Sequence, residues 1–162
     1  MKKTVVAALT LFFTVGAAHA IDTPNMKEGL WKFHMVTTSP GSAPSEVNYS
    51  LCRDHAFDQR GHDMAMKQTG CVITEGSASA SKRTFTGTCK VGATTITSVS
   101  TVTYSGDTSF HSETSTTYTP AFYGKTHDTM VQDQTYIGSC PAGMNPGDIM
   151  DTNGQIRNRT TH

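Results

Sequence analysis

The sequence predicts a mainly β protein: a single antiparallel meander sheet, curled or partly closed, with one short helix and two disulfides. Three observations support this prediction. Apolar and polar residues alternate with a period of two along much of the chain, which is typical of strands with one buried face. Turn-forming Gly, Pro, Asn and Asp residues separate these stretches. The chain also has four cysteines, an even number that permits complete pairing.

Seven stretches have the pattern of strands. In the first, Trp31, Phe33 and Met35 alternate with polar residues, so they share one face of the sheet. Serine and threonine dominate two later stretches, which indicates strands with at least one face in water. The predicted strands cover residues 29–36, 45–51, the two halves of 71–89, 94–104, 109–119 and 126–138.

The alternation disappears between residues 53 and 68. Asp54 is a favourable N-cap, because its carboxylate accepts hydrogen bonds from the first backbone amides of a helix. Glycine is a common residue just beyond the end of a helix. The sequence therefore predicts a short helix that Asp54 caps and that runs to about Arg60, before Gly61.

Two of the cysteines, Cys71 and Cys89, lie at the outer ends of a predicted hairpin whose midpoint is Ala80. Pairing about that midpoint places the two sulfurs opposite each other on adjacent strands, where a bridge is sterically possible. Four cysteines allow three connectivities, and the sequence alone does not choose among them. If the last strand pairs antiparallel with the first, Cys140 reaches the same edge as Cys52. We therefore favour the pairs Cys71–Cys89 and Cys52–Cys140.

The first twenty residues have the features of a secretory signal peptide. Two lysines form a positive start, an apolar stretch follows, and Ala18-His19-Ala20 matches the cleavage pattern. The apolar stretch is shorter than the ~20 residues that a transmembrane helix needs. We therefore expect a signal peptide over residues 1–20, a disulfide-bridged β-domain over residues 21–140 and a loop-rich tail over residues 141–162.

The charge balance argues against two classes of partner. The 13 Lys and Arg residues equal the 13 Asp and Glu residues in number, and they form no basic stripe. Binding to nucleic acid or to an anionic membrane surface needs clustered cations. We expect neither a nucleic-acid partner nor a membrane span.

Several short motifs together resemble a known family. They are Lys-Glu-Gly-Leu-Trp-Lys-Phe (27–33), Leu-Cys-Arg-Asp (51–54), Tyr-Ser-Gly-Asp (104–107) and Ile-Gly-Ser-Cys (137–140), with two internal cysteines. Their order is similar to that in a family of small exported bacterial proteins, catalogued as domain of unknown function 3617, over about residues 27–140. The resemblance implies an exported location, a bridged β-domain and no established activity. The tail after Cys140 departs from the family pattern.

The segment of residues 54–66 is the richest in side chains that suit a metal. His55, His62, Met64 and Met66 provide imidazole and thioether donors of the kind that suit copper in an exported protein. The simpler interpretation is an exposed helix and loop, with the two methionines packed on the sheet and no third histidine at ligand spacing. A periplasmic copper-binding protein is therefore the alternative function.

Catalytic motifs are missing from the sequence. It has neither a Gly-x-Ser-x-Gly elbow nor a pair of carboxylates at the spacing of a glycosidase dyad. We expect a protein that is not an enzyme and that uses no cofactor.

The aromatic residues favour binding. Trp31, Phe33 and Tyr49 either form the core or line the concave side of a curled sheet as a small hydrophobic cup. A chain with few aliphatic residues favours the core. The favoured function is an exported, non-enzymatic periplasmic protein that binds a protein partner at an open sheet edge or a small lipophilic ligand in the curled sheet.

Overall fold

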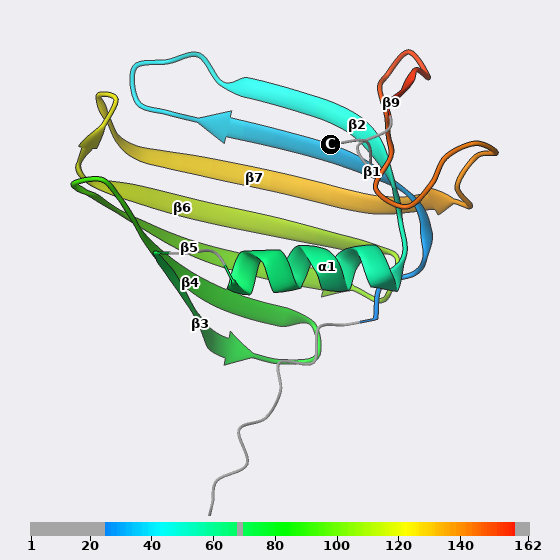
Figure 1. The fold of residues 1–162 in the computed structure, drawn as a ribbon, viewed down its shortest axis with the longest axis horizontal. Helices are drawn as coiled ribbons and strands as arrows, with labels where there is room; N and C mark the ends of the chain where they lie inside the picture. The colour runs from blue at the N-terminus through cyan, green and yellow to red at the C-terminus, as the bar shows by residue number, and fades with distance from the viewer. Residues whose placement is uncertain (1–24, 68–69, 158–162) are drawn as a thin grey trace, which may run out of the picture.

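The computed structural model describes residues 25–67 and 70–157, so the expected signal peptide over residues 1–20 lies outside the described residues. The described residues form one antiparallel sheet and one helix (Figure 1), as the sequence predicts. The helix is α1 (His55–Met66), and the strands are β1 (Gly29–Thr38), β2 (Ser45–Arg53), β3 (Cys71–Ala78), β4 (Lys82–Val91), β5 (Thr94–Ser105), β6 (Ser109–Phe122), β7 (Lys125–Gly138), β8 (Ile149–Met150) and β9 (Ile156–Arg157).

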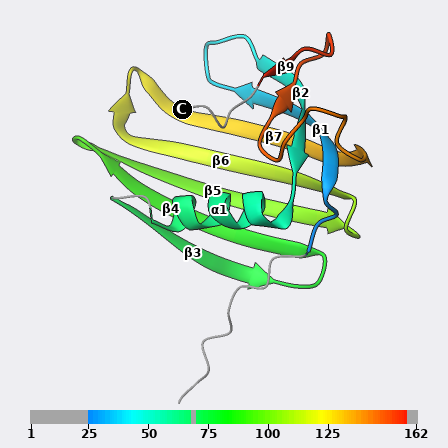
Figure 2. The same ribbon diagram turned by 45° about the vertical axis from the view of Figure 1, so that its right-hand side comes forward.

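The strands lie in the order β3-β4-β5-β6-β7-β1-β2-β8-β9, and the sheet is open. Strands β3 to β7 follow one another as a meander, and β1 then pairs antiparallel with β7, from Leu30 opposite Gly138 to Thr38 opposite Thr129. The antiparallel pairing of the first strand with the last long strand, on which the predicted bridge from Cys52 to Cys140 depends, is present. Because β2 and β3 lie far apart in the sheet, the chain must cross between them, and α1 makes that crossing (Figures 1 and 2).

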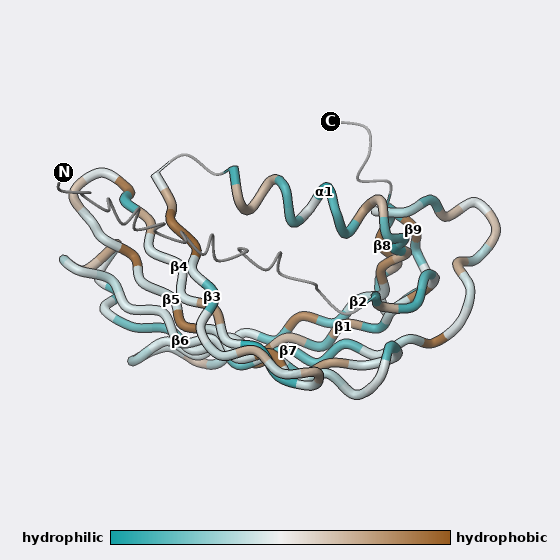
Figure 3. Tube along the Cα trace, turned by 90° about the horizontal axis from the view of Figure 1, so that it is seen from below, coloured by the Kyte–Doolittle hydropathy of each residue, from teal (hydrophilic) through white to brown (hydrophobic). Residues whose placement is uncertain are grey.

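The sheet is curled into a trough, and α1 lies across its open side (Figure 3). We call the face beneath α1 the concave face and the opposite face the convex face. Trp31, Phe33 and Leu51 are buried on the concave face, where Phe57 of α1 packs against them. Trp31 is completely buried, so the single tryptophan of the chain sits in the core.

A second, smaller core covers the other face at the end of β1 and β2. Leu30 and Cys52 alternate with Trp31 and Leu51, so they point to the convex face. Met144 from the tail buries them, with Met150 beside it. The two faces of β1 are therefore both covered near Leu30 and Trp31, one by the core under α1 and one by the tail.

The tail beyond β7 is held by backbone hydrogen bonds. The amide of Cys52 donates to the carbonyl of Asp148 at 3.0 Å, and the amide of Gly147 donates to the carbonyl of Cys52 at 2.7 Å. Strand β8 extends the sheet beside β2, with Ile149 opposite Leu51. The tail, which the sequence predicts to be rich in loops, thus contains two short strands, and the side chains of Met144 and Asp148 are buried.

Both predicted disulfides are confirmed. Cys71 and Cys89 are direct partners across β3 and β4, with their Cα atoms 4.0 Å apart. The Cα atoms of Cys52 and Cys140 are 5.5 Å apart. Because β1 lies between β2 and β7, this second bridge passes over the end of β1 and ties its two neighbours together.

The helix begins as predicted but does not end as predicted. The Asp54 carboxylate caps α1 by accepting a hydrogen bond from the amide of Phe57 at 2.6 Å. The predicted end at about Arg60 is wrong, because α1 continues through Gly61 to Met66. An internal glycine costs about 1 kcal/mol relative to alanine, and a hydrogen bond from Gln59 to Asp63 at 2.8 Å spans this position. In the part of the chain that the structure describes, no helix has the length and apolar character needed to cross a bilayer.

Candidate functional site

A cavity of about 340 Å³ lies between α1 and the concave face. Its apolar lining comes from Met26, Phe57, Tyr104 and Phe110, which belong to the segment before β1, to α1, to β5 and to β6. Its polar lining comes mainly from the start of the helix and includes Arg53, His55, Asp58 and His62.

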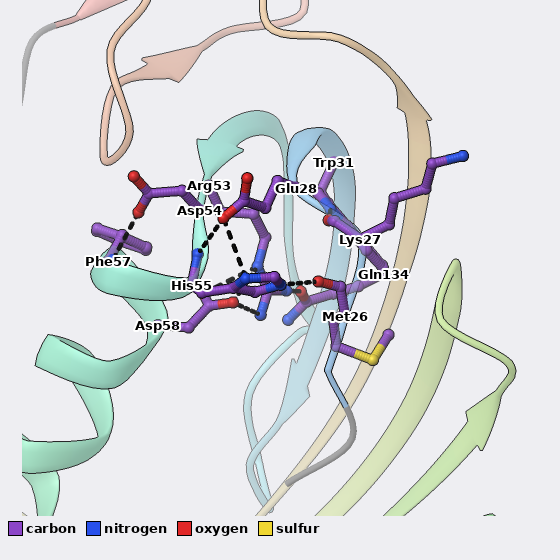
Figure 4. A network of polar contacts seen from close by, with 10 residues as sticks. All are labelled: Met26, Lys27, Glu28, Trp31, Arg53, Asp54, His55, Phe57, Asp58 and Gln134. Atoms are coloured by element: carbon purple, nitrogen blue, oxygen red, sulfur yellow. Dashed lines mark hydrogen bonds and ion pairs between the residues drawn. The ribbon is translucent and has the colours of Figure 1, made fainter.

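Arg53 fixes the first turn of α1 to the sheet (Figure 4). Its guanidinium donates to the Asp58 carboxylate from Nε at 3.0 Å and from Nη2 at 2.8 Å, and its Nη1 donates to Oε1 of Gln134 at 3.0 Å. It also lies over the Trp31 ring, 5.0 Å from its centroid. This fork-shaped pairing suits arginine, because its planar donors match a carboxylate. The arginine therefore links α1 to β7 and β1 at once.

His55 fixes the chain that precedes β1 to the same helix turn (Figure 4). Its Nε2 is 2.9 Å from the carbonyl oxygen of Met26, and its Nδ1 is 3.1 Å from Oε1 of Glu28. The Trp31 indole donates to the carbonyl of Lys27 at 2.8 Å. Both ring nitrogens of His55 thus have partners within the protein.

The rest of α1 is held less tightly than its first turn. None of its described residues is buried, although Gly61 and His62 line the cavity. Helix α1 is therefore anchored at its N-terminal end, while its later turns form the roof of the cavity. Because no described side chain of α1 is buried, the roof can shift to admit a molecule with little disturbance of the sheet.

Tyr104 connects the cavity with a second group of charges on the concave face. Burial raises the pKa of the Tyr104 hydroxyl, while Arg83 and Arg53 nearby act in the opposite direction. The Arg83 Nη1 atom lies 3.6 Å from Oε1 of Glu75, and both side chains are largely buried. Among the described residues, neither Nε of Arg83 nor Oε1 of Glu75 has a hydrogen-bond partner. Neither residue lines the cavity, so these two atoms are buried polar groups of the fold that an ordered internal water would satisfy.

The four residues suggested as metal ligands are not gathered in one place. His55 and His62 line the cavity, whereas Met64 and Met66 are 69% and 47% exposed and do not. Within residues 25–67 and 70–157, no group of three or more His, Cys, Asp or Glu residues is arranged to hold a metal ion.

The three aromatic residues suggested as facing a ligand form the core instead of the cavity wall. Trp31 and Phe33 are buried, and Tyr49 stacks on Phe33 with ring centroids 4.8 Å apart. None of the three is among the residues that line the cavity.

Sequence reasoning named His55 and His62, which line the cavity, but missed Arg53 and Tyr104 as lining residues. Arg53 belongs to the Leu-Cys-Arg-Asp motif and Tyr104 to the Tyr-Ser-Gly-Asp motif. The signal that could have found them was therefore their place in the short motifs on which the family resemblance rests.

Comparison with known proteins gives one match. A family model described as a protein of unknown function (DUF3617) matches residues 26–140, which is more than half of the chain. No curated protein and no solved structure matches the chain.

Proposed function

The chain belongs to the DUF3617 family of proteins of unknown function, so we propose a function from its geometry. We propose that it is an exported, non-enzymatic periplasmic protein that holds a small lipophilic ligand between α1 and the concave face. The observation that carries this proposal is the cavity beneath α1. Its volume of about 340 Å³ falls at the lower end of the range of small-molecule sites, roughly 300–1,000 Å³.

The lining suits a molecule that has both an apolar part and a polar part. Met26, Phe57 and Phe110 offer apolar surface, and the Tyr104 ring adds to it. The polar part of the lining, which includes Arg53, Asp58 and His62, is where a polar group of the ligand would lie. An amphipathic ligand therefore fits this cavity better than a fully polar one.

Three polar residues at the start of α1, beside the cavity, have structural roles, which supports binding over catalysis. Asp54 caps the helix, Asp58 holds Arg53, and His55 bonds to the Met26 carbonyl. Catalytic acids and bases need free access to a substrate, and these groups are occupied by the fold.

The exported, periplasmic location has two supports. The two disulfides are typical of proteins from oxidising compartments. The residue pattern of the first twenty positions is that of a cleaved signal peptide.

Energy transfer from Trp31 tests the proposal, because the chain has one tryptophan and it packs beside residues of the cavity wall. N-phenyl-1-naphthylamine is a neutral lipophilic probe that Trp31 can excite. We expect saturable probe emission on excitation of Trp31 in the disulfide-bonded protein. Absence of such emission would contradict the proposal.

Gly61→Leu is the decisive variant. A Cβ atom at Gly61 meets no other atom within 4 Å, and the residue lines the cavity, so the leucine side chain has room to occupy it. Replacing glycine inside a helix also raises helix propensity by about 0.8 kcal/mol, so loss of binding would not result from unfolding. We expect probe affinity to fall roughly tenfold or more, which corresponds to about 1.4 kcal/mol.

The matched control is Ala56→Leu on the same helix. Ala56 is exposed and does not line the cavity. This variant should bind the probe as the wild type does. Equal binding by the Gly61→Leu variant and the wild type would show that the probe binds elsewhere.

A further inference from the structure

Another cavity, of about 500 Å³, lies where β6 turns into β7. Its lining combines the rings of Tyr118, Phe122 and Tyr123 with the hydroxyl groups of Ser98 and Thr116. It shares no lining residue with the cavity beneath α1. What binds here is therefore independent of the function proposed above.

The backbone at Tyr123 is unusual for a large side chain. Tyr123 has φ 47° and Gly124 has φ 81°, and Phe122 pairs with Lys125, so the two form a two-residue hairpin turn with both φ angles positive. Such turns favour Asn, Asp or Gly, because a Cβ atom disfavours positive φ. Nevertheless, Tyr123 is 92% exposed, so burial does not compensate for the strained backbone. An exposed ring held in a strained conformation points to a role in binding.

The three rings form two walls of the cavity. Tyr118 and Phe122 are nearly parallel, with an interplanar angle of 11° and centroids 6.2 Å apart. Tyr123 stands edge-on to Phe122, at 4.5 Å and 68°. The rings thus present aromatic surface in two directions around one space.

Hydroxyl groups supply the polar part of the lining. Ser98 Oγ and Thr116 Oγ1 lie 2.9 Å apart and share one hydrogen bond, in which either can be the donor. Each hydroxyl has one hydrogen and two acceptor sites. The pair therefore retains one donor and several acceptor sites for a bound molecule.

The charges in this region neutralise one another. Lys125 Nζ lies 3.4 Å from Oδ2 of Asp128, and the Tyr118 hydroxyl donates to the same oxygen at 2.8 Å. Ser39 also donates to Asp128, and this hydrogen bond is the main reason that the pKa of Asp128 lies below its ordinary value. The carboxylate is thus ionised and paired, and the site offers no net charge to a ligand.

We propose that this cavity binds one uncharged pyranose ring of a glycan. A pyranose has faces of weakly positive C–H groups, which pack on the negative faces of aromatic rings. Its rim carries hydroxyl groups that both donate and accept hydrogen bonds, as Ser98 and Thr116 do. The balanced charge of Lys125 and Asp128 selects a neutral sugar over an anionic one.

Titration of the ¹⁵N-labelled, disulfide-bonded protein tests this site. The probes are the tetramer of N-acetylglucosamine and maltotetraose, each to about 10 mM, a concentration that detects weak binding. Sorbitol, an open-chain polyol, is the control ligand. We expect saturable shifts of the amide signals of Ser98, Thr116 and residues 122–125 with at least one saccharide, and none with sorbitol.

Tyr123→Asn provides the matched variant, since asparagine suits the turn and lacks the ring. We expect it to lose roughly tenfold or more in saccharide affinity, with an unfolding midpoint equal to or above that of the wild type. Tyr123→Phe keeps the ring and should keep binding. The proposal is overturned if no saccharide shifts these signals, if sorbitol shifts them equally, or if Tyr123→Asn binds as tightly as the wild type.

Discussion

At the scale of single residues, histidines and carboxylates alternate across the convex face. His34, Asp133 and His111 are direct neighbours on β1, β7 and β6. The Nδ1 atom of His111 lies 2.7 Å from Asp133, and that of His34 lies 3.9 Å from it. Glu113 lies 3.5 Å from the other ring nitrogen of His111. The hydrogen bond with Asp133 is the main cause that raises the pKa of His111 above its ordinary value.

A raised pKa means that the protonated imidazole stabilises the fold. This contribution is fully present below the ordinary histidine value of 6.5 and is lost as the pH rises through the higher pKa of the folded protein. His111→Gln should therefore lower the free energy of unfolding most at acidic pH, by less than about 1 kcal/mol because the pair is exposed to solvent.

Urea unfolding of the wild type and of His111→Gln, on both sides of pH 6.5, measures this difference. Asp133→Asn should remove most of the same pH dependence while leaving the imidazole in place. A stability difference that grows toward alkaline pH would contradict the assignment.

At the scale of elements, the strands were predictable from the sequence and the site was not. Trp31, Phe33 and Met35 alternate within one strand, so the period of two locates β1 to within two residues of its observed end. Gly61 misled the prediction of where α1 ends. Glycine often follows the last residue of a helix, but here Gly61 has a helical backbone and α1 continues beyond it. The cavity depends on which strand the helix faces, and Arg53 meets Gln134 only after β7 has paired with β1. No local pattern contains such long-range contacts.

The two disulfides connect elements over very different lengths of chain, and their loss should differ accordingly. Cys71 and Cys89 are 18 residues apart, whereas Cys52 and Cys140 are 88 apart. In the loop-entropy model these separations correspond to about 3 and about 4.6 kcal/mol of stabilisation. The double variant Cys52→Ala/Cys140→Ala should therefore unfold at lower urea concentration than Cys71→Ala/Cys89→Ala.

Non-reducing urea denaturation of the two double variants, with the wild type alongside, compares the two bridges directly. A larger loss of stability on removing the bridge between Cys71 and Cys89 would show that loop length does not govern the effect.

At the scale of the whole molecule, the sheet is covered from both sides by different parts of the chain. Helix α1 covers the concave face, and the tail covers the convex face where β1 and β2 end. The family match ends at residue 140, so the tail that carries Met144 lies outside the matched region. The described chain therefore relies on residues beyond the family match to complete its second core.

Met144→Ala tests how much this cover contributes to stability. Met144 is 7% exposed and packs on Leu30 and Cys52, and truncating a buried methionine costs about 2–5 kcal/mol. Met64 is 69% exposed on α1, so Met64→Ala is the matched control, with an expected change within about 0.5 kcal/mol. Urea denaturation compares the two. Equal stability of the two variants would mean that the tail adds little to the fold.

The position of β1 between β2 and β7 has a consequence for the order of folding. β2 follows β1 directly, but β7 is made only after α1 and four further strands. Until then one edge of β1 has unpaired amide and carbonyl groups, which can pair with another chain. Because distant pairings form late, this step should limit the folding rate. The bridge from Cys52 to Cys140 joins the ends of β2 and β7, which flank β1, so oxidation would lock β1 in place after the last long strand has docked.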